Sequence, residues 1–353
     1  MSDRKTTAVV ICPGRGTYNE SGLGYLRRLH AAQSEFLDRV DAHRRAQNQP
    51  TIRELDSRPE YSLAVHGHGD NAGPLIFSCS YCDFLSIDRT AFEVVAVTGN
   101  SLGWYTALAC AGALGVDQAF RIVNSVGAYL HAAHIGGQVI CSTVDEEWLP
   151  IPGRRQELLE AMRSIHKRDG MELYVSIELG GMIVFSGNEP GLAAFLARVA
   201  RGPGRFPMRL QPHEAYHSPL QAPVAERAKA TLPADWFGSP AVPVIDGRGH
   251  VWLPQATDGQ QLWDYTLRTQ VTDVYHFTRA VQVAVREFRP DCLILVGPGD
   301  TLGGAVAQAL IQVRWRGLDS KRAFLESARE APYLLSMGRE DQRRRVVAAG
   351  RMP

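Results

Sequence analysis

The amino-acid sequence predicts a layered α/β fold with a mainly parallel sheet. Short apolar segments rich in β-branched residues recur along the chain, and most are bounded by Gly or Pro, as is typical of buried parallel strands. Segments with helical periodicity lie between them, which favours an α/β arrangement. The expected strands are residues 8–12, 94–97, 139–141, 182–185, 242–245 and 292–296. The expected helices are residues 101–113, 118–133, 189–200 and 277–288.

Each segment has its own local signal. Residues 8–12 read Ala-Val-Val-Ile-Cys and stop at a proline, whereas residues 94–97 read Val-Val-Ala-Val and lead through a glycine into an Ala- and Leu-rich helix. The strands at 139–141 and 182–185 are also short and rich in β-forming residues. The last strand, at 292–296, ends at a Gly-Pro pair.

Composition narrows the class of protein but not its activity. A chain of 353 residues is long enough for one large domain or two smaller ones. With 38 Lys and Arg against 37 Asp and Glu, the net charge of +1 argues against nucleic acid or a membrane surface as a partner. No run approaches the roughly 18 apolar residues of a membrane span. Six cysteines do not form a disulfide framework, so we expect a reduced, soluble, cytoplasmic protein without a metal site.

A serine lies where a nucleophile would be expected. Residues 99–103 read Gly-Asn-Ser-Leu-Gly, directly after a predicted strand and before a predicted helix. This context is typical of a nucleophile elbow, in which flanking glycines permit a sharp turn and the serine hydroxyl stands at a helix N-terminus. The alternative is that Ser101 only caps an ordinary strand-to-helix turn. A catalytic serine also needs a base, and among eleven histidines His217 stands out, on a loop that reads Tyr-His-Ser-Pro-Leu.

Five ordered segments together resemble the malonyl-CoA:acyl carrier protein transacylase family, which includes acyltransferase domains of polyketide synthases. The matching segments read Ile-Cys-Pro-Gly-Arg-Gly at 11–16, Gly-Asn-Ser-Leu-Gly-Trp-Tyr-Thr-Ala-Leu at 99–108, Ala-Gly-Ala-Leu at 111–114, Tyr-His-Ser-Pro-Leu at 216–220 and Val-Gly-Pro-Gly at 296–299 with Leu302. Their order and spacing agree with the family over roughly residues 8–310.

The resemblance implies an α/β-hydrolase-like large subdomain that carries a ferredoxin-like inserted small subdomain. The core would be discontinuous, over residues 1–136 and 207–313, with the insert at 137–206. Residues 314–353 lie beyond the resemblance, and we expect them to form a basic C-terminal tail with ten Lys and Arg against five Asp and Glu. This tail is either a solvated helix pair or an electropositive face for an acidic protein partner.

The resemblance also implies a catalytic mechanism and site residues. Ser101 would be the nucleophile and His217 its general base. The backbone N–H groups of Leu102 and Arg15 would form the oxyanion hole. The family orients its histidine with a backbone carbonyl, which the alignment places near His276 in this chain.

The implied reaction is acyl transfer through an acyl-serine intermediate, between a thioester donor and an acyl carrier protein, in polyketide or fatty-acid-type biosynthesis. Coenzyme A or phosphopantetheine thioesters would be substrates, and no permanently bound cofactor is implied. Two alternatives stay open. One is a carrier-protein thioester hydrolase on the same fold, with an editing role. The other is an inactive subunit that docks a carrier protein.

Departures from the family pattern bear on the acyl group. Malonyl-specific members carry an arginine about 25 residues past the serine, where this chain has Val126. Burial of the malonyl carboxylate without such a partner would weaken binding by several kcal/mol by order of magnitude, as when one partner of a buried ion pair is removed. We therefore expect an acyl group other than malonyl. Asn100, Tyr216 and Glu178 also differ from the family pattern and are further predicted pocket residues. Arg15 replaces a glutamine, and two interpretations stay open for it. Either it brings a cation to the cleft that would accommodate an acidic acyl group by another route, or only its backbone N–H matters.

Overall fold

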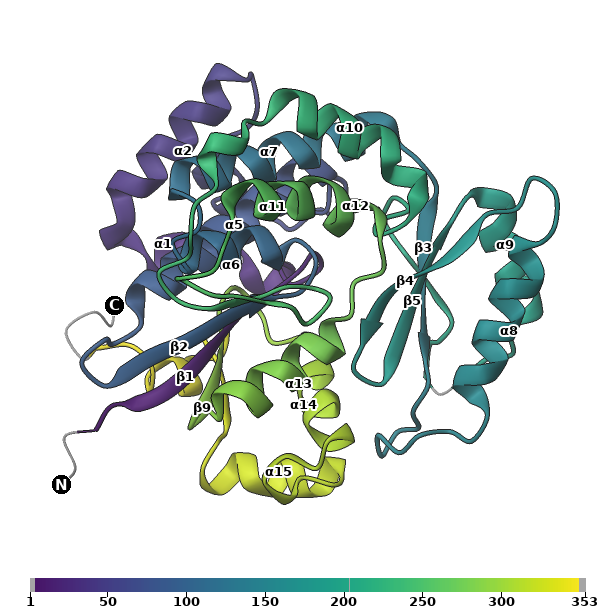
Figure 1. The fold of residues 1–353 in the computed structure, drawn as a ribbon. Coiled ribbons are helices and arrows are strands. Elements are labelled where there is room, and N and C mark those ends of the chain that lie inside the picture. The colour runs from purple at the N-terminus through teal and green to yellow at the C-terminus, as the bar shows by residue number, and fades with distance from the viewer. Residues whose placement is uncertain (1–3, 203, 349–353) are drawn as a thin grey trace.

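The computed structural model describes residues 4–202 and 204–348, which form two sheets, each with its own helices (Figure 1). Residues 1–3, 203 and 349–353 of the predicted domain ranges lie outside the described residues. Within the described ranges, no helix combines the length and the apolar character needed to cross a membrane.

The larger sheet has six strands in the order β10, β9, β1, β2, β7, β8, and every neighbouring pair is parallel except β7 with β8. The strands are β1 (Thr6–Cys12), β2 (Phe92–Gly99), β7 (Val244–Ile245), β8 (Val251–Trp252), β9 (Cys292–Leu295) and β10 (Leu334–Ser336). Residues 8–12 of β1 are completely buried, which explains their uninterrupted apolar sequence.

Helices cover both faces of this sheet, as the α/β prediction requires. Figure 1 shows α5, α6 and α7 on one side and α13 and α14 on the other. The large-subdomain helices are α1 (Tyr25–Leu29), α2 (Ser34–Ala46), α3 (Ile52–Asp56), α4 (Leu63–His66), α5 (Gly69–Ser86), α6 (Gly103–Cys110), α7 (Val116–Ala133), α10 (Ala222–Thr231), α11 (Gly259–Asp264), α12 (Gln270–Thr272), α13 (Phe277–Phe288), α14 (Gly303–Gln312), α15 (Lys321–Glu330) and α16 (Glu340–Arg343).

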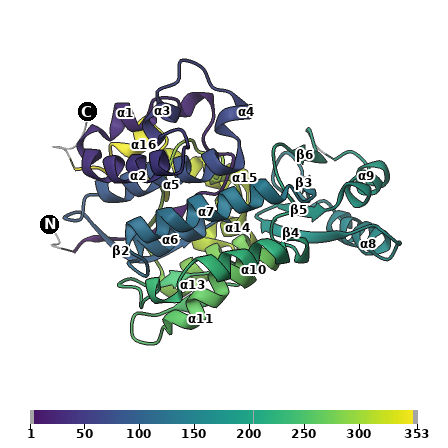
Figure 2. The ribbon, with the colours of Figure 1, turned by 90° about the horizontal axis from the view of Figure 1, so that it is seen from above.

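The smaller sheet is antiparallel, with the strand order β4, β5, β3, β6. Its elements follow one another as β3 (Gly137–Ser142), α8 (Arg154–His166), β4 (Leu173–Leu179), β5 (Met182–Gly187), α9 (Glu189–Arg198) and β6 (Met208–Leu210). This β-α-β-β-α-β order is the ferredoxin-like motif that the resemblance implied. Figure 2 shows the unit as a lobe beside the larger subdomain. Buried apolar side chains form a separate core within it.

Two predicted boundaries are wrong. The insert does not stop at residue 206, because β6 pairs with β3 and closes the small sheet at Leu210. The segment from residue 314 onward is not a separate tail, because its strand β10 pairs with β9 and forms the edge of the large sheet. The prediction missed β10 because this short apolar strand lies in a segment that is rich in Lys and Arg.

Candidate active site

Ser101 lies on a sharp turn between β2 and α6. Its φ of 54° is in the left-handed region, which residues other than glycine rarely adopt. The glycines on either side make the turn possible. A Cβ on Gly99 would lie 2.2 Å from the carbonyl of Gly103, and a Cβ on Gly103 would lie 2.1 Å from the Cys12 carbonyl oxygen. The backbones of β1, the turn and the start of α6 are therefore in direct contact. This contact leaves no room for a Cβ at either glycine, consistent with the sharp turn that the Gly-x-Ser-x-Gly pattern indicates.

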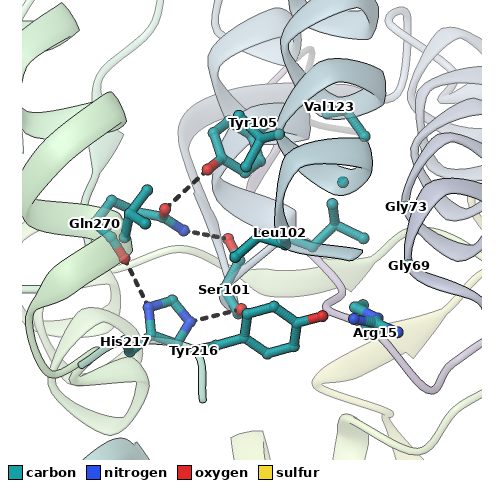
Figure 3. A pocket seen from close by; sticks show the side chains of 14 residues that line it. Arg15, Gly69, Gly73, Ser101, Leu102, Tyr105, Val123, Tyr216, His217 and Gln270 are labelled. Atoms are coloured by element: carbon teal, nitrogen blue, oxygen red, sulfur yellow. Dashed lines mark hydrogen bonds between the residues drawn. The ribbon is translucent and has the colours of Figure 1, made fainter. Parts of the chain in front are cut away.

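His217 is the hydrogen-bond partner of the serine hydroxyl (Figure 3). Its Nε2 lies 2.7 Å from Ser101 Oγ, and its Nδ1 lies 2.7 Å from the backbone oxygen of Gln270. A carbonyl can only accept, so Nδ1 carries the proton and the lone pair of Nε2 faces the hydroxyl. Burial lowers the pKa of His217 to about 4, and the hydrogen bond to Gln270 opposes that shift. The imidazole is consequently neutral near pH 7, which is the form a general base requires.

The carbonyl that orients His217 belongs to Gln270, so the prediction of His276 is wrong. The backbone N–H of His276 instead donates to Gly247 O at 2.6 Å, and the residue stands at the start of α13. A π-helical segment at Tyr265–Thr269 leads directly into α12, and the Gln270 carbonyl in α12 faces the histidine. Neither the π-helical geometry nor this carbonyl leaves a side-chain pattern in the sequence.

The side chain of Gln270 forms two more hydrogen bonds in the site. Its Nε2 donates to Ser101 O at 3.1 Å, and its Oε1 accepts from the Tyr105 hydroxyl at 2.9 Å (Figure 3). One residue thus contacts the backbone of Ser101, the ring of His217 and the first turn of α6. Sequence reasoning missed Gln270, because a single glutamine in a helical segment carries no distinguishing signal.

The two N–H groups predicted for the oxyanion hole belong to residues beside Ser101. Leu102 immediately precedes α6, and Arg15 lies on the loop after β1. Among the described residues, neither N–H pairs with a backbone or side-chain acceptor. The loop approaches the elbow closely, since a Cβ on Gly14 would lie 2.8 Å from Asn100 O. Their role in oxyanion binding stays a prediction.

A pocket opens beside Ser101 between α5, α6 and α7, and we call it the acyl pocket. Its walls are mostly apolar or glycine, and Val126 and Tyr216 are among them. The lining residues are Arg15, Gly69, Gly73, Ser101, Leu102, Tyr105, Val123, Val126, Gly127, Leu130, Tyr216, His217, Gln270 and Val271.

Two predicted pocket residues do not line it. Asn100 is buried against the loop after β1, where its N–H donates to Cys12 O at 2.9 Å. Glu178 lies on β4, and both its oxygens accept from Arg155 on α8, at 2.7 and 2.8 Å. The side chain of Glu178 is therefore engaged within the small subdomain rather than in the acyl pocket.

Arg15 brings a cation into the acyl pocket, and its guanidinium contacts two backbone carbonyls, Glu214 and the Tyr216 ring. Its Nη2 donates to the carbonyl oxygens of Gly67 and Pro212, both at 2.8 Å. Its Nη1 lies 3.3 Å from Glu214 Oε2, and the guanidinium lies 5.2 Å from the centre of the Tyr216 ring. Burial lowers the pKa of Arg15, and the charge of Glu214 acts in the opposite direction.

The chain is similar to known proteins at low sequence identity. No protein-family model matches it. It is 23% identical over 326 residues to the "Phenolphthiocerol synthesis polyketide synthase type I Pks15/1" of Mycobacterium marinum, covering 86% of this chain and 13% of that protein. It is 24% identical over 238 residues to the "Malonyl CoA-acyl carrier protein transacylase" of Bacillus subtilis, covering 67% of this chain and 71% of that protein.

The fold is likewise shared with solved structures. The malonyl-CoA:ACP transacylase of Synechocystis sp. PCC 6803 superposes with a TM-score of 0.72 at 21% identity, over 97% of this chain and all of that one. The chain thus spans most of a transacylase but a small part of the polyketide synthase. In motif order and in fold, it resembles the malonyl-CoA:acyl carrier protein transacylases and is related to them.

Proposed function

We propose that this chain is an acyltransferase that moves an acyl group between a thioester donor and an acyl carrier protein through an acyl-serine intermediate. The observation that carries the proposal is the relay from Ser101 Oγ through His217 to the Gln270 carbonyl, with both links at 2.7 Å. A relative named as a malonyl CoA-acyl carrier protein transacylase, and a solved transacylase with the same fold, support this reaction class over other serine chemistry.

The proposed steps need only groups within this site and the two thiols. His217 Nε2 takes the Ser101 proton while Oγ attacks the thioester carbonyl carbon. The backbone N–H groups of Leu102 and Arg15 hold the oxyanion. Collapse breaks the C–S bond, and the imidazolium returns its proton to the departing thiolate. The thiol of a carrier-protein phosphopantetheine arm then reverses the sequence and leaves with the acyl group.

We further propose that the acyl group is uncharged. Val126 lies in the acyl pocket at the position where the resemblance implies an arginine for malonyl. The only guanidinium there, among the described lining residues, is already paired with Glu214. A carboxylate buried in this pocket would lack a free counterion, whereas an aliphatic chain would fit the apolar walls.

Mass spectrometry of the intact protein tests both statements. The protein is incubated with a panel of acyl-CoA and acyl-carrier-protein thioesters, alongside Ser101→Ala. We expect an adduct with an uncharged acyl donor that is absent in Ser101→Ala and moves to holo carrier protein when this is added. Release of free acid without carrier acylation would favour the hydrolase. No adduct and no turnover with any donor would favour an inactive docking subunit, and a preference for malonyl-CoA would refute the uncharged acyl group.

A further inference from the structure

We infer that Tyr275 is a positioning residue, which holds the ring of His217 in place relative to the nucleophile elbow and ties both to the small subdomain. This inference rests on the proposed function, because it assumes that His217 activates Ser101. Tyr275 is not among the residues that line the acyl pocket. The inference therefore concerns the geometry of the base and not the choice of acyl group.

The first step of the argument is the contact between two rings. The centroids of the Tyr275 and His217 rings lie 5.2 Å apart, and their planes are tilted by 52°. Aromatic rings attract each other at such a separation. Tyr275 is 1% exposed, so protein rather than water surrounds this contact. The hydrogen bonds at the two imidazole nitrogens set the direction of the base, and the neighbouring ring restricts how far it can tilt.

The second step is that the Tyr275 ring is itself held from two sides. Its hydroxyl donates to Gly99 O at 2.6 Å, at the end of β2 and two residues before Ser101. Burial raises the pKa of Tyr275, so the hydroxyl stays protonated and remains a donor. A Cβ on Gly247 would lie 2.5 Å from two carbons of the ring, so backbone packs closely against it. The side chain thus spans the distance from the elbow to the base.

The third step is the attachment of Tyr275 to the small sheet. Its N–H donates to Ser176 O at 2.8 Å, and its carbonyl accepts from the N–H of Glu178 at 2.9 Å. These bonds make a parallel bridge between Tyr275 and Ile177 on β4. The connection from α12 to α13, which contains Tyr275, runs beside the small sheet (Figure 1). The small subdomain therefore holds the main chain of a residue whose side chain contacts the base.

The same strand also contacts the loop that carries the base. The buried hydroxyl of Ser176 donates to Tyr216 O at 2.8 Å, and it accepts from Gln138 Nε2 on β3 at 2.7 Å. Tyr216 immediately precedes His217. Strand β4 is thus bonded to both segments that orient the imidazole. A displaced Tyr275 side chain would consequently change the position of the base relative to the serine.

The test measures how fast an alkyl fluorophosphonate modifies Ser101. The serine oxygen bonds to phosphorus while His217 takes the proton and fluoride leaves, so the rate reports on the base without a thioester or a carrier protein. We expect Tyr275→Leu to lower the rate constant by about tenfold or more, because a misplaced reacting group is costly. Tyr275→Phe keeps the ring against His217 and loses one hydrogen bond, so it should react within about threefold of the wild type.

The extent of labelling separates positioning from folding. Intact mass gives the fraction of the protein that reacts, which counts folded molecules, whereas the rate constant describes each of them. Tyr333→Leu is the matched control, because Tyr333 is 7% exposed and immediately precedes β10, the edge strand of the large sheet. This control is expected to lower at most the labelled fraction and to leave the rate constant unchanged.

The outcomes also separate this inference from the proposed function. A rate constant for Tyr275→Leu equal to that of the wild type would overturn the positioning role. A rate constant for Tyr275→Phe as low as that of Tyr275→Leu would overturn it too, because the ring contact is then not the cause. The expected rate constants together with no acyl adduct from any thioester would remove the proposed function and leave the role of Tyr275 intact. No modification of wild-type Ser101 would overturn both.

A second variant covers the case in which Tyr275→Leu does not fold. Gly247→Ala places a methyl group against the Tyr275 ring and is expected to lower the rate constant by displacing it. Gly238→Ala meets nothing within 4 Å and should leave the rate constant unchanged. A rate constant for folded Gly247→Ala equal to that of Gly238→Ala would contradict the dependence of the base on the position of this ring.

Discussion

At the scale of single residues, the site depends on keeping His217 neutral while it is buried. Its Nδ1–H donates a hydrogen bond to a backbone carbonyl rather than to a carboxylate. No negatively charged group is therefore hydrogen-bonded to the ring to stabilise the imidazolium. Burial lowers the pKa to about 4. His217 is therefore neutral and able to accept a proton over a wide range of pH. Its protonated form is correspondingly less stable than it would be beside a carboxylate.

This arrangement predicts the pH dependence of acylation. Only neutral His217 accepts the serine proton, so lowering the pH through the pKa of about 4 should remove activity. We expect the rate of Ser101 acylation under kcat/KM conditions to be flat from about pH 8 to about pH 5.5 and to fall below that range. Coenzyme A release measured across pH, with Ser101→Ala as the blank, checks this. An inflection at 6.5 or above would contradict it.

Gln270 is expected to position the relay through its side chain as well as its carbonyl. Gln270→Leu removes the bonds to Ser101 O and the Tyr105 hydroxyl while leaving the main-chain carbonyl for His217. Two lost hydrogen bonds of about 1 kcal/mol each predict a loss of roughly thirtyfold in single-turnover acylation. Tyr105→Phe removes one of these bonds and should cost less. A rate for Gln270→Leu within a factor of two of the wild type would exclude this positioning role.

At the scale of elements, the nucleophile elbow relies on close backbone contact between β1, β2 and α6. A methyl group on Gly103 would lie 2.1 Å from the Cys12 oxygen and 2.9 Å from the Pro13 oxygen. Both contacts are with backbone oxygens, which cannot move away by a change of rotamer as the end of a flexible side chain can. The glycine is thus needed for packing, independently of any catalytic role of the serine two residues before it.

Gly103→Ala is expected to destabilise the protein by about 3 kcal/mol or more, because the strands must separate to admit the methyl group. Gly238→Ala is the matched control. Gly238 is exposed, has nothing within 4 Å of its virtual Cβ and is not among the glycines with positive φ. Its substitution should change the free energy of unfolding by less than about 0.5 kcal/mol. Urea unfolding of both variants checks the contrast, and equal destabilisation would contradict it.

The elements also show what sequence patterns can predict. Strands with four or more consecutive apolar residues, such as β1 and β9, and the Gly-x-Ser-x-Gly turn were found because their signals are local. The edge strands β6 and β10, with three residues each, were missed, because they owe their conformation to pairing with β3 and β9. The same holds for the site: Ser101 and His217 belong to motifs, whereas the Gln270 carbonyl is placed only by the tertiary structure.

At the scale of the whole molecule, the C-terminal segment completes the large subdomain from the other end of the chain. The N–H of Asp88 donates to Val346 O at 2.9 Å, beside a bridge between Ile87 and Val347. Arg343 reaches further, into a buried cluster around Asp83 on α5. The segment's excess of positive charge is consequently not all available to an acidic partner.

Asp83 gathers donors from distant parts of the chain, which makes the cluster a junction between them. His30 Nε2 lies 2.8 Å from one of its oxygens, and the Tyr25 hydroxyl and the Gly297 N–H both donate to the other at 2.7 Å. Arg343 supplies the opposite charge. The side chains of Asp83 and Arg343 are 0% and 6% exposed, so neither charge is satisfied by water if the other is removed.

We therefore expect substitutions of two neighbouring arginines to lower the free energy of unfolding by very different amounts. Arg343→Met leaves Asp83 buried without its cation, and we expect a loss of about 3–5 kcal/mol in the free energy of unfolding. Arg344 pairs with Glu340 in solvent, with side chains 64% and 74% exposed, so Arg344→Met should cost less than about 1 kcal/mol. Urea unfolding of the two variants measures the difference. Similar small losses in the two variants would contradict a structural role for the Asp83–Arg343 pair.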